Sequence, residues 1–306
     1  MVETTNDAAM TVVARETLNM PKVVGAPSKQ KLKEEDEIFR GFFGAPIGII
    51  VILWNMIVPL INMSGAAPKH VLWALVHLKI YSTANVHRRI VGWPSLVTYR
   101  KWTWYILGKI ASLKADVIKL DNRFEGFDIS SGATCLLSVD GIDCMTNEPW
   151  PFDTKWYSQK FNGPGVKYEV GVCIKTGHIV WTNGPFPAGK GDGTICIEGL
   201  LNYLAEDEGV EVDAGYKGHP KFKAPVVATS RKDRKEKSVV RGRHEAINGR
   251  LKIFNVLVAP FRHLTPRNKM MEKHGICFDA VSVVTQLKFA HGDSTVFSVD
   301  YDVAYD

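Results

Sequence analysis

The sequence predicts an α/β protein in which a mixed β-sheet flanked by helices follows a smaller helical region. Three patterns lead to this prediction: an uncharged apolar stretch at residues 42–63, two short apolar segments that run into aspartates 140 and 213, and a helical pattern rich in Lys and Arg at residues 240–254. With 306 residues, of which 45% are hydrophobic, the chain has enough material for a sizeable core.

The N-terminal part of the chain divides into a polar and an apolar segment. Residues 1–40 lack apolar periodicity and an apolar signal-peptide region, so we expect a mobile tail and no secretory signal. In residues 42–63, Pro46 and Pro59 bracket only twelve residues, whereas a membrane span needs about 20. This favours a buried core helix, and membrane anchoring through residues 42–63 stays the less favoured alternative.

Two further helices are expected in residues 41–125. One covers residues 70–82, and the other covers residues 95–113 with Ser95 as a candidate N-cap. Residues 86–104 fit a helix-turn-helix whose second helix presents Tyr99, Arg100 and Lys101. The alternative, which we favour, is an ordinary helical layer with its tryptophans in the core.

The sheet is predicted from the order of the elements. A strand from Cys135 ends at Asp140, a β-hairpin at residues 167–185 turns around Thr176–His178, a helix covers residues 194–209, and a strand then ends at Asp213. The helix is expected to be capped by Thr194 and to stop at Gly209. This order makes the first and fourth strands neighbours, which brings the two aspartates close together.

The stretch VRGRHEAINGRLKIF at residues 240–254 places four polar side chains on one helix face and an apolar stripe beside them. The polar face contains Arg241, Glu245, Asn248 and Lys252, and the stripe contains Ile247, Leu251 and Phe254. Alone, Arg241 and Glu245 are an ordinary exposed ion pair. Together with Asp140 and Asp213, Glu245 completes a set of carboxylates of the kind that holds divalent ions for phosphoryl transfer.

Positive charge is concentrated around this helix. Residues 217–252 contain twelve Lys or Arg and three acids, which gives this segment nine more positive than negative charges. This excess is larger than the net charge of +6 for the whole chain. Such a segment suits a polyanionic substrate, although a solvated loop or a nuclear-import signal at residues 230–237 remains open. The five cysteines form no CxxC pair, which predicts reduced, mostly buried thiols with neither structural zinc nor a disulfide framework. A last helix is expected within residues 261–287, followed by an acidic tail at 294–306.

Four segments in this order resemble the DDE-type transposases of the PIF/Harbinger group: SVDGID, KYEVGVCIKTGHIVWTNGPFPAGKGD, VEVDAGYKG and RGRHEAINGRLKIF. The resemblance implies an RNase H-like catalytic core at residues 126–293 that binds two Mg2+ or Mn2+ ions. By position, Asp140, Asp213 and Glu245 match the three acids. Asp143 lies close to Asp140 in the sequence and could be mistaken for it. The residues expected to support the metal ligands without binding the ions themselves are Asp143, Asp192, His244 and Asn248.

The resemblance also implies a reaction and partners. Metal-bound water attacks a phosphodiester at the end of a DNA element, and the freed 3′-hydroxyl then attacks target DNA. The implied partners are DNA, a second copy of the chain in a homodimer and a Myb-like DNA-binding protein, and the implied location is the nucleus. The residues expected to hold DNA phosphates are Arg231, Lys232, Arg234, Lys235, Lys237, Arg241, Arg243 and Lys252. The alternative is a catalytically inactive, domesticated DNA-binding protein derived from such an enzyme.

Overall fold

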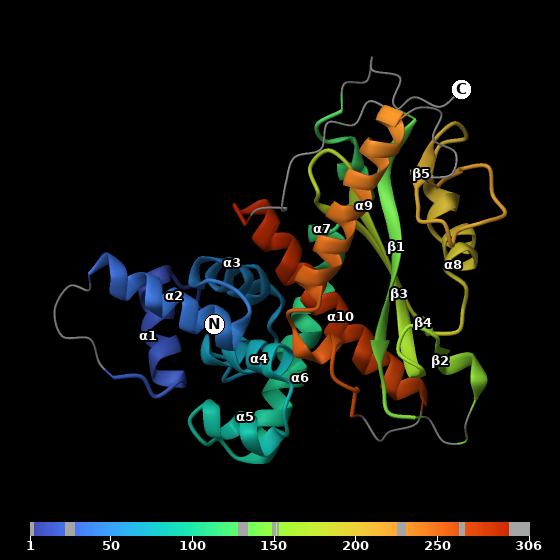
Figure 1. Ribbon diagram of the computed structural model, residues 1–306. Coiled ribbons are helices and arrows are strands. Elements are labelled where there is room, and N and C mark those ends of the chain that lie inside the picture. The colour runs from blue at the N-terminus through green and yellow to red at the C-terminus, as the bar shows by residue number, and fades with distance from the viewer. Residues whose placement is uncertain are drawn as a thin grey trace. The chain divides into compact units, whose positions relative to one another are not determined.

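A computed structural model describes residues 3–21, 28–127, 134–148, 151, 153–224, 231–262 and 267–293 (Figure 1). The chain forms two compact units. The helical unit comprises Met1–Ala115, Lys252–Ala259 and Ile276–His291, and the sheet unit comprises Asp116–Leu251, Pro260–Gly275 and Gly292–Asp306. The protein is therefore of mixed α/β class, as predicted, and C-terminal segments contribute to both units. The predicted acidic tail at 294–306 lies outside the described residues.

The helical unit contains helices where the apolar patterns predict them. Its helices are α1 (Asp7–Thr17), α2 (Lys29–Phe43), α3 (Ile47–Ile57), α4 (Lys69–Ile80), α5 (Ala84–Ile90) and α6 (Leu96–Ser112), with a 3-10 turn η1 (Val58–Leu60). α3 starts directly after Pro46, and Ile50 and Trp54 on it are fully buried. The Ser95 hydroxyl accepts the backbone N–H of Thr98 over 3.0 Å, so the predicted cap of α6 is confirmed.

Residues 1–40 differ from the expected tail because α1 and α2 occupy much of this segment. Asn6 caps α1, and Met10 and Ala14, one turn apart, are fully buried. The Asn55 side chain on α3 accepts the N–H of Thr5 over 2.9 Å and donates to its carbonyl over 3.0 Å. A short buried stripe and specific polar contacts thus order a segment whose composition alone is that of a tail.

The other two expectations for this unit concern membranes and DNA. Among the described helices, none is long and apolar enough by itself to cross a membrane, and α2 with Ile47–Leu60 passes this test only as a pair bent by 50°. In the helix-turn-helix hypothesis, Tyr99 is presented on the surface, but it is only 1% exposed. Trp102 is also buried, whereas Arg100 and Lys101 are exposed, which agrees better with the helical-layer alternative. The expectation that the tryptophans lie in the core is wrong for Trp93, which is 56% exposed.

The sheet unit is built on a mixed sheet of six strands within the described residues. They are β1 (Cys135–Met145), β2 (Tyr157–Ser158), β3 (Gly163–Cys173), β4 (Ile179–Pro187), β5 (Gly209–Glu211) and β6 (Phe222–Lys223). Their order is β2-β3-β1-β5-β6, with β4 on β3. The hairpin of β3 and β4 is confirmed, and so is the neighbourhood of the first and fourth predicted strands, because β1 pairs in parallel with β5.

Several predicted boundaries in this unit are wrong. The strand expected to end at Asp213 ends at Glu211, and the helix expected at residues 240–254 ends at Leu251, so Lys252 and Phe254 lie beyond it. β1 does not end at Asp140 but continues through Gly141 to Met145, because each of these residues pairs with β3. The predicted helix at 194–209 is shorter and starts earlier, as α8 (Asp192–Glu198) without a side-chain cap, followed by a 3-10 turn η5 (Leu200–Tyr203). Gly199, with φ −112° and ψ −97°, interrupts the helix between them.

Helix α9 (Arg231–Leu251) runs alongside β1 on one side of the sheet, and α8 lies on the other (Figure 1). α9 begins at Arg231, so residues 231–237, for which a solvated loop was one expectation, are helical. Its apolar residues Ile247 and Leu251 are fully buried, and Val240 packs with Cys135 and Ile174.

The remaining elements are short, apart from the last helix. They are α7 (Lys114–Val117), η2 (Leu120–Phe124), η4 (Thr154–Trp156), η7 (Asn255–Leu257) and α10 (Arg267–Ala290). α10 confirms the predicted last helix, and Val281, Val283 and Val284 on it are fully buried. The cysteines are buried and have free thiols.

Candidate active site

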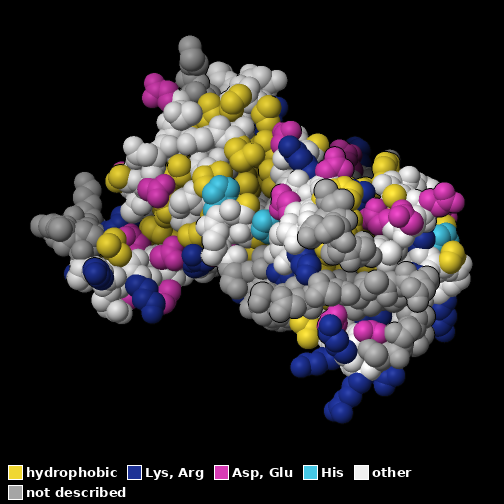
Figure 2. Space-filling view, turned by 90° about the horizontal axis from the view of Figure 1, so that it is seen from above, with side chains coloured by type: hydrophobic (Ala, Val, Ile, Leu, Met, Phe, Trp, Pro, Cys, Tyr) yellow, Lys and Arg dark blue, Asp and Glu magenta, His cyan; other side chains and the backbone are white. Residues whose placement is uncertain are grey.

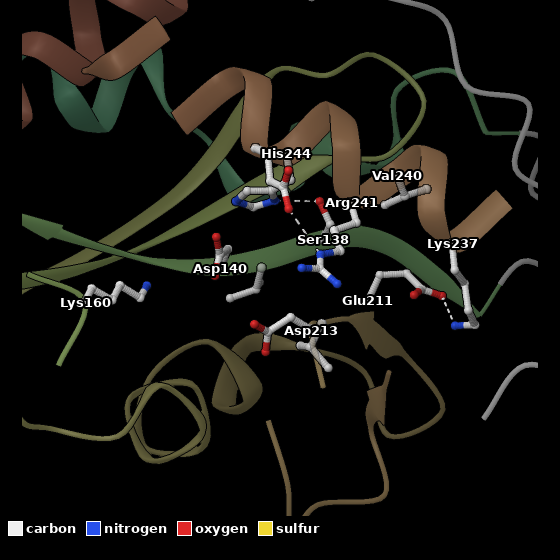
Figure 3. Close-up of a pocket in the computed structure, with 12 residues that line it drawn as sticks. Ser138, Asp140, Lys160, Glu211, Asp213, Lys237, Val240, Arg241 and His244 are labelled. Carbon is white, nitrogen blue, oxygen red and sulfur yellow. Dashed lines mark hydrogen bonds and ion pairs between the residues drawn. The ribbon is translucent and has the colours of Figure 1, made fainter. Parts of the chain in front are cut away.

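The three predicted carboxylates line one pocket of about 170 Å3 in the sheet unit. Asp140 comes from β1, Asp213 from the turn after β5, and Glu245 from α9, so three segments far apart in the sequence contribute one acid each. Figure 3 shows Asp140 and Asp213 beside the space below α9. The pocket is also lined by Lys160 and Arg241, and by buried residues that include Ser138, Glu211 and Lys237.

Polar contacts set the position of α9 over the sheet. His244 Nδ1 lies 2.8 Å from Ser138 Oγ, and the Asn248 amide donates to Asp140 Oδ2 over 3.1 Å. Ser138 and Asp140 share one face of β1 because they are two residues apart, and His244 and Asn248 share one face of α9 because they are four apart. The helix that carries Glu245 is thus in register with the strand that carries Asp140.

Asp140 sits in an environment that opposes its ionisation. Burial raises the pKa of its carboxyl from 3.8 to about 6, while the Lys160 ammonium and a hydrogen bond from the Gly141 N–H act in the opposite direction. The negative charges of Asp213 and Asp192 add to the rise in the Asp140 pKa. A cation that binds next to Asp140 therefore relieves an electrostatic cost already present in the fold.

Asp213 and Glu245 are held less firmly than Asp140. Asp213 Oδ1 accepts the N–H of Gly215 over 2.7 Å within its own turn. Glu245 pairs with Arg241, one turn earlier on α9, with Arg241 Nε 3.2 Å from Glu245 Oε1 and side-chain exposures of 55% and 61%. Exposed pairs of this kind contribute only about 0.3–0.5 kcal/mol, so a ligand can separate them easily.

The pocket has the donor chemistry of a hard divalent ion, since its three predicted ligands offer only carboxylate oxygens. Within the described part of the chain, however, no three His, Cys, Asp or Glu side chains are close enough to form a ready ligand group. Asp140 and Asp213 line one pocket, and the charge of Asp213 acts on Asp140. Glu245 lines the same pocket but is paired with Arg241.

The acids Asp143 and Asp192 lie behind the pocket and not in it. Asp143 is three residues from Asp140 and so belongs to the opposite face of β1, where it accepts a hydrogen bond from the Ser158 hydroxyl. Asp192 Oδ1 lies 2.8 Å from Lys167 Nζ and packs against Gly141, whose added Cβ would be 2.9 Å from Asp192 Cγ. This supports Asp140 as the pocket acid and places Asp143 and Asp192 behind it.

Two groups of this site carry no signal in the sequence. Lys160 donates to the Gly141 carbonyl over 2.9 Å beside Asp140, but it lies in an irregular segment between β2 and β3. Glu169 on β3 accepts from Trp181 Nε1 over 2.7 Å, and burial, together with the charge of Asp192, raises its pKa to about 7. Only the pairing of Glu169 with Gly141 across the strands brings it near the site, and that register cannot be read before the fold is known.

The predicted DNA contacts divide into exposed and buried residues. The exposed ones are Arg231, Lys232, Arg234, Lys235, Arg241 and Lys252. Lys237 and Arg243 do not fit the expectation of exposed DNA contacts, because both are buried. Lys237 Nζ lies 2.6 Å from Glu211 Oε1, and Arg243 donates to the Ile174 carbonyl over 2.7 Å. They fasten α9 to the sheet. Lys and Arg side chains project from the lower edge of the surface in Figure 2.

His244, predicted as a group behind the ligands, is buried and lines the pocket itself. Its burial lowers the pKa of the imidazole to about 3, so the ring is neutral at physiological pH. His244 Nε2 is buried and has no hydrogen-bond partner among the described residues.

Comparison with known proteins adds no relative. No family model matches the chain, and neither a curated protein nor a solved structure was found to match it.

Proposed function

We propose that the protein is a metal-dependent DNA endonuclease of the transposase type, built on an RNase H-like core. It cleaves phosphodiester bonds at the ends of a DNA element and transfers the freed 3′-hydroxyl strand to target DNA. The observation that carries this proposal is the meeting of Asp140, Asp213 and Glu245 in one pocket, from three separate segments. The parallel pairing of β1 with β5, with α9 alongside β1, is compatible with the RNase H-like topology.

In this proposal, Asp140 and Asp213 hold divalent ions, with Glu245 as the third ligand. When bound, two such ions activate an attacking oxygen and stabilise the leaving oxygen of the phosphodiester. The chain's own groups position the substrate. Asn248 holds Asp140 through Oδ2, and Lys160 and Arg241 neutralise the phosphate charge on either side of the acids.

Binding of DNA would break the ion pair between Arg241 and Glu245. A phosphate oxygen competes for the Arg241 guanidinium, since Arg binds phosphate in a bidentate manner. Because the exposed Arg241–Glu245 pair is weak, this exchange frees the carboxylate for the ion at little cost. The active arrangement then forms only with DNA and metal present.

A second candidate function is a DNA-binding protein without catalysis. The pairing of Glu245 with Arg241 and the lack of a ready three-acid group among the described residues favour it. Such a protein binds DNA with an affinity that falls as salt rises, by about 0.9 per phosphate contact on a double-logarithmic plot, and shows no turnover with any divalent ion.

The test is nicking of supercoiled plasmid DNA with Mn2+, which needs no knowledge of the element's ends. We expect cleavage by the wild type and at least a hundredfold slower cleavage by Asp140→Asn, Asp213→Asn and Glu245→Gln, since even groups behind a metal ligand cost about 10–100-fold. Asp121→Asn is the matched control, because the Asp121 side chain is 96% exposed and lies outside the pocket. Equal nicking by all five proteins contradicts the proposal, and binding without nicking by the wild type favours the second candidate.

A further inference from the structure

A second hollow of about 660 Å3 lies beside the carboxylate pocket in the sheet unit. We call it the flanking hollow, and the residues used below that line it are Asp143, Tyr157, Lys160, Lys167, Lys190 and Asp192. Lys160 lines both spaces, and Gly215 in the flanking hollow donates its N–H to Asp213 Oδ1. The two spaces therefore meet at Lys160 and at the turn that carries Asp213.

The floor of the flanking hollow is a fixed polar network. Lys167 has a side chain only 9% exposed, and its Nζ lies 2.8 Å from Asp192 Oδ1, 3.8 Å from Asp143 Oδ1 and 3.0 Å from the Lys190 carbonyl. The Ser158 hydroxyl donates to the other oxygen of Asp143. Donors and acceptors are thus held in place before any ligand arrives, which lowers the ordering cost of binding.

The charge of the flanking hollow limits what fits in it. Lys160 and Lys167 balance Asp143 and Asp192, and the Lys190 ammonium is paired with Glu198 over 2.6 Å, so these groups carry no net charge. Lys167 stands between the two aspartates and disfavours a divalent cation there, while the aspartates disfavour a bare multivalent anion. A group with polar edges and at most one charge therefore fits in the hollow, and a nucleotide within a DNA strand is such a group.

Tyr157, the first residue of β2, provides an aromatic surface at the rim of the flanking hollow. It is 41% exposed, and its hydroxyl donates to Asn162 Oδ1 over 3.3 Å, which ties down the polar end of the ring. Aromatic side chains beside positive charge are the usual platform for an unstacked base, because every base has a π-face.

We propose that the flanking hollow binds the nucleotide next to the scissile phosphate, with its base unstacked from its neighbour and placed against Tyr157. Lys160, at the junction of the two spaces, contacts the phosphate that joins this nucleotide to the cleaved bond. The inference rests on the proposed function, because the carboxylate pocket defines where the scissile phosphate lies. It adds a base-binding site that tolerates different sequences and selects for DNA that can be locally unstacked.

The test compares two single-stranded probes, a fluorescein-labelled twelve-residue oligothymidylate and an abasic strand of the same length. Binding is measured by anisotropy with Ca2+, whose flexible coordination occupies oxygen sites. We expect the wild type to bind the oligothymidylate about tenfold more tightly than the abasic strand, and Tyr157→Ala to bind both about equally, since base–aromatic stacking is lost. Tyr157→Phe should keep the preference.

The matched control is Tyr203→Ala, because Tyr203 is 64% exposed and lies outside both spaces. It should bind like the wild type. A wild type that does not prefer the oligothymidylate, or a Tyr157→Ala variant that loses affinity equally for both probes, overturns the inference. Plasmid nicking separates the two proposals. Nicking without a Tyr157-dependent preference overturns only the nucleotide site, whereas the preference without nicking leaves a base-binding site at Tyr157 and overturns its place next to a scissile phosphate.

Discussion

Asp140→Asn should stabilise the fold at neutral pH in the absence of divalent ions. The Asp140 carboxyl has a pKa of about 6 in the folded protein against 3.8 as its ordinary value, and each pKa unit corresponds to about 1.4 kcal/mol. Ionised Asp140 therefore costs the folded state about 3 kcal/mol. Asparagine carries no charge, so it escapes this cost, and the net gain should be about 1–3 kcal/mol because some of the hydrogen bonding is lost.

The pH dependence has a defined sign. Between about pH 4 and pH 6 the folded wild type holds a proton on Asp140 that the unfolded chain has already released, so its stability falls as the pH rises through this window and is level above it. The advantage of Asp140→Asn should thus be absent below about pH 4 and complete above about pH 6.

Urea unfolding at pH 4, 5, 6 and 7.5, with and without Mn2+, measures this difference. Mn2+ should cancel most or all of this advantage at pH 7.5, because an ion bound to the folded wild type at a hundred times its Kd adds about 2.7 kcal/mol. Glu169→Gln serves as a comparison with the same sign and a window from about pH 4.5 to 7, because the pKa of Glu169 is raised to about 7. A difference between wild type and Asp140→Asn that is the same at every pH refutes the reasoning.

Three further predictions concern the groups around the pocket. Lys237→Ala should lower the free energy of unfolding by about 3–5 kcal/mol in urea, because it leaves buried Glu211 without its ammonium partner, whereas exposed Lys235→Ala should change it by less than about 0.5 kcal/mol. The double variant Arg234→Ala/Lys235→Ala should reduce the slope of log affinity for DNA against log salt by about 1.8 if both side chains contact phosphates, and an unchanged slope excludes both. Gly141→Ala should destabilise the fold by about 1–3 kcal/mol and slow plasmid nicking, because the new Cβ collides with Asp192 behind Asp140. A Gly141→Ala variant with the stability and nicking rate of the wild type would contradict this close packing.

The sequence predicted those parts of the site that depend on local periodicity. The helical repeat predicts Glu245 and Asn248 on one helix face, and in the structure the Asn248 amide donates a hydrogen bond to Asp140 on β1. The neighbourhood of β1 and β5 followed from the order of the elements, and with it the shared pocket of Asp140 and Asp213. These features need only the repeat of a helix, the alternation of a strand and the short connections between them.

Burial of charged residues could not be predicted in this way. A run of Lys and Arg is expected to be solvated along its whole length. Lys237 and Arg243 are nevertheless buried, because Lys237 pairs with Glu211 and Arg243 donates to the Ile174 carbonyl. The order of the N-terminal segment could not be predicted either, because Thr5 is held by Asn55, which lies 50 residues away in the sequence. Partners distant in sequence decided each case.

The central claim is that Asp140, Asp213 and Glu245 bind divalent ions together, and Mn2+ binding followed by electron paramagnetic resonance tests it most directly. The account predicts that wild-type protein with the twelve-residue oligothymidylate binds Mn2+ at pH 7.5, more weakly at pH 5 where Asp140 keeps its proton, and at least about tenfold more weakly in Asp213→Asn. Asp121→Asn should bind Mn2+ like the wild type. Equal Mn2+ affinity in the wild type and in Asp213→Asn would contradict the claim.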